Sequence, residues 1–110
     1  MSEPVEIDVH AVAQLYRKGE PFLWIDCREP EEWEIARIEG SQLIPMGEIE
    51  RHLPQFIGHQ EQRVIVHCHH GRRSLWVVQM LRQAGLTRAQ SMAGGIEAWS
   101  REIDPNVPTY

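Results

Sequence analysis

Short apolar runs alternate with helical patterns along the chain, and this alternation constrains the fold more than any other feature of the sequence. Each run is brief and nearly continuous in hydrophobicity, which is typical of strands buried on both faces of a parallel sheet. Strands joined by helices predict an α/β fold with a parallel sheet covered on both faces. We expect strands at residues 22–25, 42–44, 64–67 and 89–92, and helices at residues 9–18, 31–36, 46–53, 74–84 and 96–100.

Glycine and proline residues mark several of the predicted helix boundaries. Gly19 and Gly85 follow helical patterns, as glycines after a last helical turn do. Pro30 stands at a first-turn position, whereas Pro54 is expected to end the helix at 46–53. The sequence contains no repeat, low-complexity segment or internal linker, so we expect residues 1–110 to form a single domain.

Charge and composition narrow the range of partners. The net charge is −5, which predicts no general attraction to nucleic acid or to an anionic membrane. The N-terminus lacks the basic and apolar blocks of a signal peptide, and no apolar stretch approaches the roughly 20 residues that span a bilayer. Two cysteines do not indicate a disulfide framework, and we expect a cytoplasmic protein whose thiols stay reduced.

The segment from Cys68 to Ser74 carries the clearest chemistry. Cys68 stands where a predicted strand ends and a helix is about to begin, the edge at which α/β sheets hold their active sites. Backbone N–H groups at such a turn are unsatisfied, and the helix dipole adds positive charge. Both effects favour a thiolate, so we predict that Cys68 is a nucleophile with a lowered pKa. The polar loop also argues against burial of Cys68 in an apolar core.

Other residues of this loop suit supporting roles. Gly71 is free to adopt a positive φ where N–H groups converge into an anion nest. Arg73 is expected either to reach back and hold the loop or to bind an anionic donor. Arg72 either guides substrate or is simply exposed. Ser74 is placed to cap the helix, a structural role that we favour over a catalytic one.

The histidines beside Cys68 raise the question of a metal site. His67, His69 and His70 are adjacent to the cysteine or to one another, and neighbouring ligands in a tight turn converge poorly on one tetrahedral centre. We therefore predict no metal. His69 or His70 as a general base is a further option, although a thiolate activated by its loop needs none.

Three residues at the end of the first long apolar run also lie at this edge of the predicted sheet. Asp26 and Arg28 are candidates for an ion pair that braces the active-site loop, in a supporting role. Cys27, three residues from the middle of the run, is interpreted as a packing residue.

Four motifs, in order along nearly the whole chain, resemble those of the rhodanese sulfurtransferase family. Residues 25–33 resemble its Asp-Val-Arg-Glu-Pro segment, with Cys27 in the valine position, and residues 38–45 its Gly-Ala/Ser…Ile-Pro segment. Cys68–Ser74 matches the Cys-x-x-Gly-x-Arg-Ser loop, and residues 93–99 match the Gly-Gly…Trp ending. Arg37 departs from the pattern, since the family often has histidine there.

The resemblance implies a rhodanese-like three-layer fold whose central parallel sheet has about five short strands. It also implies a sulfurtransferase of the thiosulfate type, in which Cys68 takes sulfur from a donor such as thiosulfate and carries it as a persulfide. Residues 69–74 would bind the donor and the persulfide, and the acceptor would be cyanide, a thiol or a partner protein. No cofactor is implied.

Two alternatives remain open. The related phosphatases and arsenate reductases have loops that resemble His-Cys-x5-Arg, and His67 and Cys68 match the start of that pattern. Here Arg73 is the fifth residue after Cys68, so the loop is one residue shorter, which suits a sulfur atom better than a phosphate. The second alternative is a rhodanese-like module that docks partners without turnover; the presence of the cysteine weighs against it.

Overall fold

Five parallel strands form one sheet in the part of the chain that the computed structural model describes, residues 3–56, 58 and 60–110. The strand order is β1-β5-β4-β2-β3, so β4 lies at the centre of the sheet. The elements are β1 (Glu6–Ile7), α1 (Val9–Lys18), β2 (Leu23–Asp26), α2 (Pro30–Ile35), β3 (Gln42–Leu43), the 3₁₀-helix η1 (Met46–Glu48), α3 (Ile49–Phe56), β4 (Val64–His67), α4 (Arg72–Gln83), β5 (Ala89–Met92) and α5 (Gly95–Glu102).

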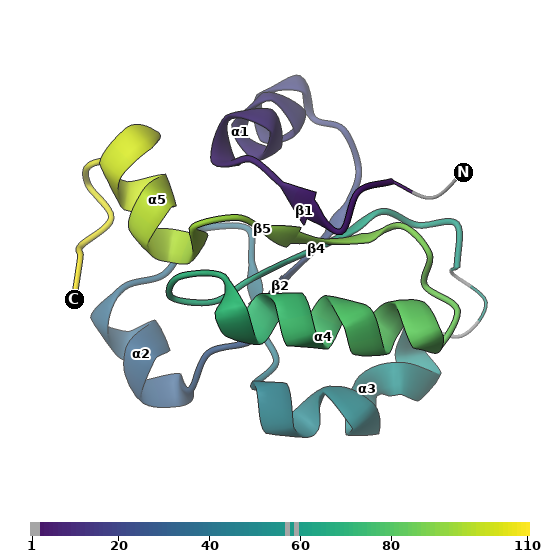
Figure 1. Ribbon diagram of the computed structural model, residues 1–110. Helices are drawn as coiled ribbons and strands as arrows, with labels where there is room; N and C mark the ends of the chain where they lie inside the picture. Colours follow the sequence, from purple (N-terminus) through teal and green to yellow (C-terminus); the bar gives the residue numbers. More distant parts are fainter. Residues whose placement is uncertain (1–2, 57, 59) are drawn as a thin grey trace.

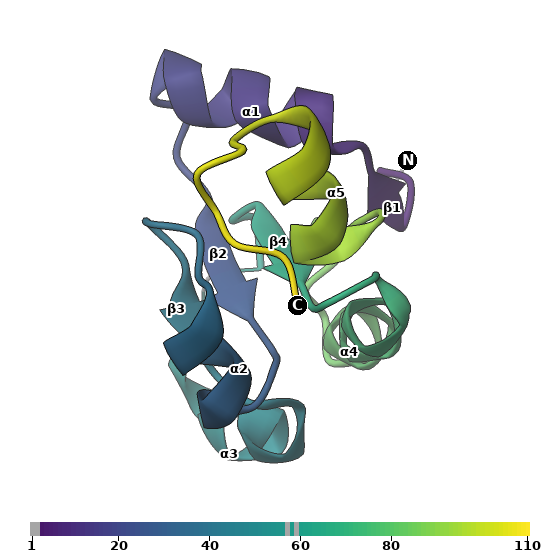
Figure 2. The same ribbon diagram turned by 90° about the vertical axis from the view of Figure 1, so that its left-hand side faces the viewer.

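Helices cover both faces of this sheet, as predicted (Figures 1 and 2). Helices α1 and α5 pack on one face, where Trp24 of β2 and Ile65 of β4 join their apolar side chains. Helices α3 and α4 pack on the other face, against Ile25 and Val66. Successive strand residues thus serve opposite cores, which explains why β2 and β4 are apolar with little alternation. The predicted α/β class with a parallel sheet and helices on both faces is confirmed.

Two predictions about the elements were wrong in detail. Strand β1 was not predicted, because its two residues are too few to show a period. Pro54 does not end its helix: α3 continues to Phe56. The φ of proline is compatible with a helix, and the single backbone hydrogen bond lost there is offset by burial of Ile49 and Phe56 against the core. The bounds of α1, β4 and β5 are as predicted, and those of β2, α2, β3, α4 and α5 differ by at most two residues at either end.

The register of β2 and β4 fixes what lies at the carboxyl edge of the sheet. Leu23 pairs with Val64, and the last pair is Asp26 with His67. The next residues, Cys27 and Cys68, therefore leave the sheet side by side. No helix among the described residues has both the length and the apolar character to cross a bilayer.

Candidate active site

Backbone N–H groups converge on the sulfur of Cys68. The N–H of Gly71 lies 3.1 Å from Sγ and that of Ser74 lies 3.4 Å from it. Gly71 adopts φ 107° and precedes the first residue of α4, Arg72. The predicted positive φ at Gly71 is thus confirmed, and the turn directs donors of the first helical turn at a sulfur that sits at the helix N-terminus.

Ser74 does not cap the helix, contrary to the sequence-based expectation. Helix α4 begins two residues earlier, after Gly71, so Ser74 lies within its first turn. The N-cap residue Gly71 has no side chain to cap this helix end, and the Cys68 sulfur accepts the hydrogen bonds instead. The Ser74 hydroxyl lies 3.5 Å from the Cys68 sulfur and 2.7 Å from the hydroxyl of Ser91 on β5. Ser74 therefore contacts the reactive atom directly.

Helix α5 binds two carbonyl groups of the loop, those of Cys68 and His69. The N–H of Ile96 donates to the Cys68 carbonyl at 2.9 Å, and the N–H of Glu97 donates to the His69 carbonyl at 3.2 Å. This contact requires a glycine at position 95, where a Cβ atom would lie 2.4 Å from the His69 carbonyl oxygen and 2.5 Å from that of Cys68. The first turn of α5 thus holds the loop with its N–H groups facing inward.

Cys68 is buried, with 1% of its surface exposed, although the polar loop had argued against burial. It packs in the core cluster of α3 and α4, and the N–H groups of Gly71 and Ser74 reach its sulfur. The side chain therefore contacts both apolar groups and hydrogen-bond donors. The neighbouring Cys27 thiol contributes most to lowering the pKa of Cys68 to about 4. Burial raises the pKa of Cys68, whereas the Ser74 hydroxyl and the N–H groups of Ser74 and Gly71 lower it further.

Arg73 holds the loop rather than projecting freely into it. Its guanidinium forms a two-point ion pair with Glu32 of α2, at 2.7 Å and 2.9 Å. These bonds chiefly lower the pKa of Glu32 to about 2. Burial opposes the shift, whereas hydrogen bonds from the Glu29 backbone and from Tyr110 support it. Arg72 is exposed. Of the two roles predicted for Arg73, the structure favours the loop-holding one.

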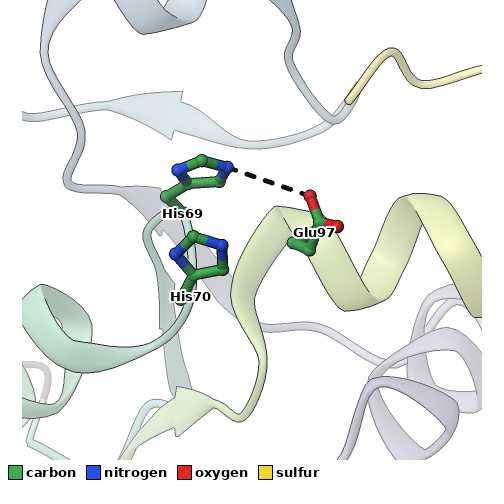
Figure 3. Close-up of side chains that lie close together, drawn as sticks. All are labelled: His69, His70 and Glu97. Atoms are coloured by element: carbon green, nitrogen blue, oxygen red, sulfur yellow. Dashed lines mark ion pairs between the residues drawn. The ribbon is translucent and has the colours of Figure 1, made fainter. Parts of the chain in front are cut away.

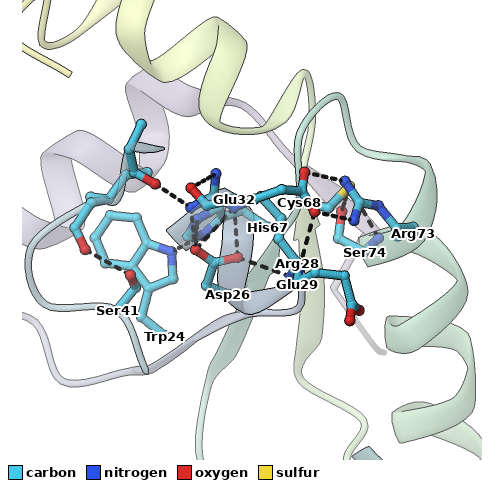
Figure 4. A network of polar contacts seen from close by, with 12 residues as sticks. Trp24, Asp26, Arg28, Glu29, Glu32, Ser41, His67, Cys68, Arg73 and Ser74 are labelled. Carbon is cyan, nitrogen blue, oxygen red and sulfur yellow. Dashed lines mark hydrogen bonds and ion pairs between the residues drawn. The ribbon is translucent and has the colours of Figure 1, made fainter. Parts of the chain in front are cut away.

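Asp26 and Arg28 form the buried ion pair predicted from the sequence, with Nη2 2.7 Å from Oδ2 and neither side chain exposed to solvent (Figure 4). Burial disfavours the charged carboxylate, but His67 and Arg28 outweigh it and hold the pKa of Asp26 well below its usual range. The indole N–H of Trp24 donates to His67 Nδ1 at 2.9 Å, so Nε2 carries the proton and faces Asp26 Oδ2 at 3.3 Å.

Tyr110 connects this buried ion pair to the loop. Its hydroxyl accepts a hydrogen bond from Arg28 at 2.8 Å and donates to Glu32 at 2.7 Å. Its ring stacks on His69 with centroids 4.0 Å apart. A continuous polar chain therefore runs from Trp24 through His67, Asp26, Arg28 and Tyr110 to Glu32 and Arg73.

His69 and His70 come closer together than the prediction allowed. Their rings stack with centroids 3.9 Å apart, and Glu97 of α5 lies 3.9 Å from His69 (Figure 3). Ligand atoms of these three side chains lie within 4.8 Å of one another. Stacked rings direct their nitrogen lone pairs side by side rather than toward one point, which is poor geometry for a metal. Burial and the neighbouring His70 also lower the pKa of His69.

Several residues of the site were missed or misjudged from the sequence. Glu32 and Tyr110 gave no motif of their own, since their partners are far away in the sequence. Cys27 was interpreted as a packing residue; it is buried in the cluster that contains Cys68, and it also lowers the pKa of Cys68. The equal register of two neighbouring parallel strands is the signal that would have placed it there.

The chain is similar to known proteins over most or all of its length. The adenylyltransferase and sulfurtransferase MOCS3-1 of Zea mays is 33% identical over all of this chain, and the probable adenylyltransferase/sulfurtransferase MoeZ of Mycobacterium tuberculosis is 34% identical over 84% of it. The chain spans only 25% and 24% of those two relatives. The crystal structure of a rhodanese-like domain protein from Staphylococcus aureus superposes with a TM-score of 0.79 at 26% identity, covering 97% of this chain and 99% of that one.

The family comparison covers the same ground as the fold. The sequence pattern of the Rhodanese-like domain matches residues 8–102, which run from the residue before α1 to the end of α5 and include the Cys68 loop. The five-stranded parallel sheet and its helices are those of the similar solved structures. The chain therefore belongs to the rhodanese-like domain family.

Proposed function

We propose that this protein is a sulfurtransferase that carries sulfane sulfur on Cys68. The observation that carries the proposal is the surroundings of the Cys68 sulfur, which accepts N–H groups from Gly71 and Ser74 and lies beside the Ser74 hydroxyl. Such donors stabilise a thiolate in the resting enzyme and a persulfide anion after sulfur transfer. The names of similar proteins, among them MOCS3-1 and MoeZ, support the same class of reaction.

In the first step the Cys68 thiolate attacks the outer sulfur of thiosulfate. A sulfur–sulfur bond forms at Cys68, the sulfur–sulfur bond of thiosulfate breaks, and sulfite leaves with the electron pair. In the second step a thiophilic acceptor, such as cyanide, a thiol or a thiol of a partner protein, attacks the terminal sulfur and frees the thiolate. This is covalent catalysis with two half-reactions.

The two arginines of the loop, Arg72 and Arg73, have different roles. Arg72 is exposed, so it is free to attract an anionic donor. Arg73 is paired with Glu32. Its role is to hold in place the first turn of α4, which carries N–H donors of the site. This engagement also weighs against the phosphatase alternative, which needs an arginine free to grip a tetrahedral anion.

The test is turnover of thiosulfate and cyanide to thiocyanate and sulfite. We expect Cys68-dependent formation of thiocyanate, and none from Cys68→Ser, whose hydroxyl is a poor nucleophile with no lowered pKa. Aryl phosphate hydrolysis measured alongside decides the phosphatase alternative. A well-folded wild-type protein without sulfur transfer from thiosulfate or from a low-molecular-weight persulfide would favour the docking module instead.

A further inference from the structure

Cys27 is a buried thiol next to the reacting sulfur, and the two half-reactions above do not use it. We propose that Cys27 resolves the Cys68 persulfide: its sulfur attacks Cys68 Sγ, closes a Cys27–Cys68 disulfide and releases the terminal sulfur as hydrosulfide. This inference rests on the proposed function, because it needs the persulfide. It makes Cys27 a second catalytic residue, and hydrosulfide a product that needs no external acceptor at the site.

The backbone places the two cysteines within reach of a disulfide. Strands β2 and β4 run parallel in equal register, up to the pair Asp26 and His67. The ladder continues one residue further, since the N–H of Cys27 donates to the His67 carbonyl at 3.0 Å. Neighbouring strands lie about 4.8 Å apart. That spacing falls within the Cα separations of roughly 4.4–6.8 Å that disulfides bridge.

The two side chains also point to the same side of the sheet. Trp24 faces the α1 and α5 core, and Ile25 faces the α3 and α4 core. Continuing this alternation by two residues puts Cys27 on the α3 and α4 side, where Cys68 lies as well; both belong to that cluster. The two thiols therefore lie in the same packed cluster, close enough for each to shift the pKa of the other.

The surroundings of Cys68 separate the resolving thiol from the leaving sulfur. Cys27 reaches Sγ from the end of β2, whereas the N–H groups of Gly71 and Ser74 reach it from the loop and α4. When the loop donors hold the terminal sulfur, the inner sulfur Sγ faces Cys27. Attack on the inner sulfur is the reaction that expels sulfide.

Atoms, charge and electrons balance without an outside oxidant. The Cys27 thiol and the Cys68 persulfide anion give the disulfide and HS⁻: the bond from Sγ to the terminal sulfur breaks, and the new bond joins Sγ to the Cys27 sulfur. The Cys27 proton goes to the departing sulfur. The sulfane sulfur is reduced to sulfide by two electrons, while the two cysteine sulfurs are oxidised to the disulfide. An external dithiol then restores the reduced enzyme.

The order of these events follows from the charge on Cys68. In the resting enzyme the neighbouring Cys68 sulfur, followed by burial, raises the pKa of the Cys27 thiol, which keeps it protonated. Persulfide formation moves the negative charge from Sγ to the terminal sulfur, away from Cys27. The group that opposes ionisation of Cys27 is therefore weakened only after sulfur has been loaded.

The test is an anaerobic single turnover of the reduced, full chain with thiosulfate and no acceptor, followed by intact mass and by sulfide assay. Wild-type protein is expected to release one equivalent of sulfide per chain and to end about 2 Da lighter than the reduced protein. Cys27→Ala and Cys27→Val are expected to stop at the persulfide, about 32 Da heavier, and to release no sulfide. Two variants are used because the site is buried, and their folding is checked by thermal melting. Reduced protein without thiosulfate should stay unchanged.

The outcomes separate this inference from the proposed function. Persistent added sulfur on wild-type protein, with no sulfide, would overturn the role of Cys27 while leaving the sulfurtransferase intact. Absence of added sulfur on both Cys27 variants, together with absence of thiocyanate formation by the wild type, would overturn the sulfurtransferase itself and the resolving step with it.

Discussion

Arg73 and Glu32 meet in a two-point ion pair that joins the first turn of α4 to α2, across 41 residues of chain. Both side chains are partly shielded, with 32% and 19% of their surfaces exposed. Planar, two-point pairs of this kind are among the stronger ionic contacts in proteins. The pair therefore bears on stability as well as on the position of the loop.

Glu32→Gln should lower the free energy of unfolding by about 1–2 kcal/mol, because it removes the charge that Arg73 faces. Urea denaturation measures this change. Arg101→Gln is the matched control: it breaks the Arg101 pair with Glu97, in which the arginine is 71% exposed, and should cost less than about 0.5 kcal/mol. Equal costs for the two variants would show that the Arg73 contact adds no more than a surface pair.

Acid should destabilise the protein through Asp26 and Glu32. Burial opposes the charge on Asp26, yet His67 and Arg28 hold its folded-state pKa well below the usual range, and Arg73 chiefly lowers the pKa of Glu32 to about 2. Carboxylates in the unfolded chain titrate near 4. Because the folded-state pKa is the lower one, stability is fully present above about pH 4 and is lost as the pH falls toward 2 and below.

Unfolding free energies measured between about pH 2 and 7 test this dependence. The Glu32→Gln variant should show a shallower acid slope than the wild type, since one of the titrating groups is gone. A wild-type stability that is flat between pH 4 and 2 would contradict the assignment.

Cys68 should be a thiolate well below neutral pH. With a pKa of about 4, its absorbance near 240 nm and its alkylation by iodoacetamide should change little above about pH 6. Cys27→Ala removes the largest stabilising contact and should move the titration upward by about one pH unit or more. Cys68→Ser, which retains Cys27, should show no thiolate below about pH 8. A wild-type transition near that of free cysteine would disprove the prediction.

Gly95→Ala should disable the loop from outside it. The added Cβ would press on the carbonyls of Cys68 and His69, and the φ of 62° at this position disfavours a side chain. We expect sulfur transfer to fall roughly tenfold or more and stability to fall by about 1–3 kcal/mol. Gly47→Ala is the control, because a Cβ there meets open space; it should change stability by less than about 0.5 kcal/mol. Unimpaired transfer by Gly95→Ala would show that α5 does not hold the loop.

The sequence was sufficient to predict the layers of the fold and the place of Cys68, the candidate nucleophile, at the end of a strand. The apolar runs and their glycine and proline boundaries place β2, β4 and α4 to within two residues, because local period and chain stiffness determine them. The ion pair of Asp26 and Arg28 was also within reach, since the two residues are nearly adjacent. These features depend on interactions between near neighbours in the chain.

The partners that tune the site depend instead on tertiary packing. Tyr110 contacts Arg28 across 82 residues of the chain, and no sequence pattern around either residue predicts the other as its partner. The role of Cys27 depends on the register of two strands, which the sequence does not state. Ser74 was misassigned because a serine before a helical pattern resembles a cap, whereas the sulfur of Cys68 takes that place here.

The hydroxyls of Ser74 and Ser91 are hydrogen-bonded to each other, and either of them can be the donor. Each hydroxyl has one proton, so the pair can be oriented in two ways. Facing a thiol, Ser74 accepts from the sulfur and donates to Ser91; facing a thiolate, it turns its proton to the sulfur and accepts from Ser91. The electrostatic response to the charge of the sulfur is therefore a reversal of two O–H bonds. The surroundings of the sulfur can therefore follow a change in its charge by rotation of these two hydroxyls alone.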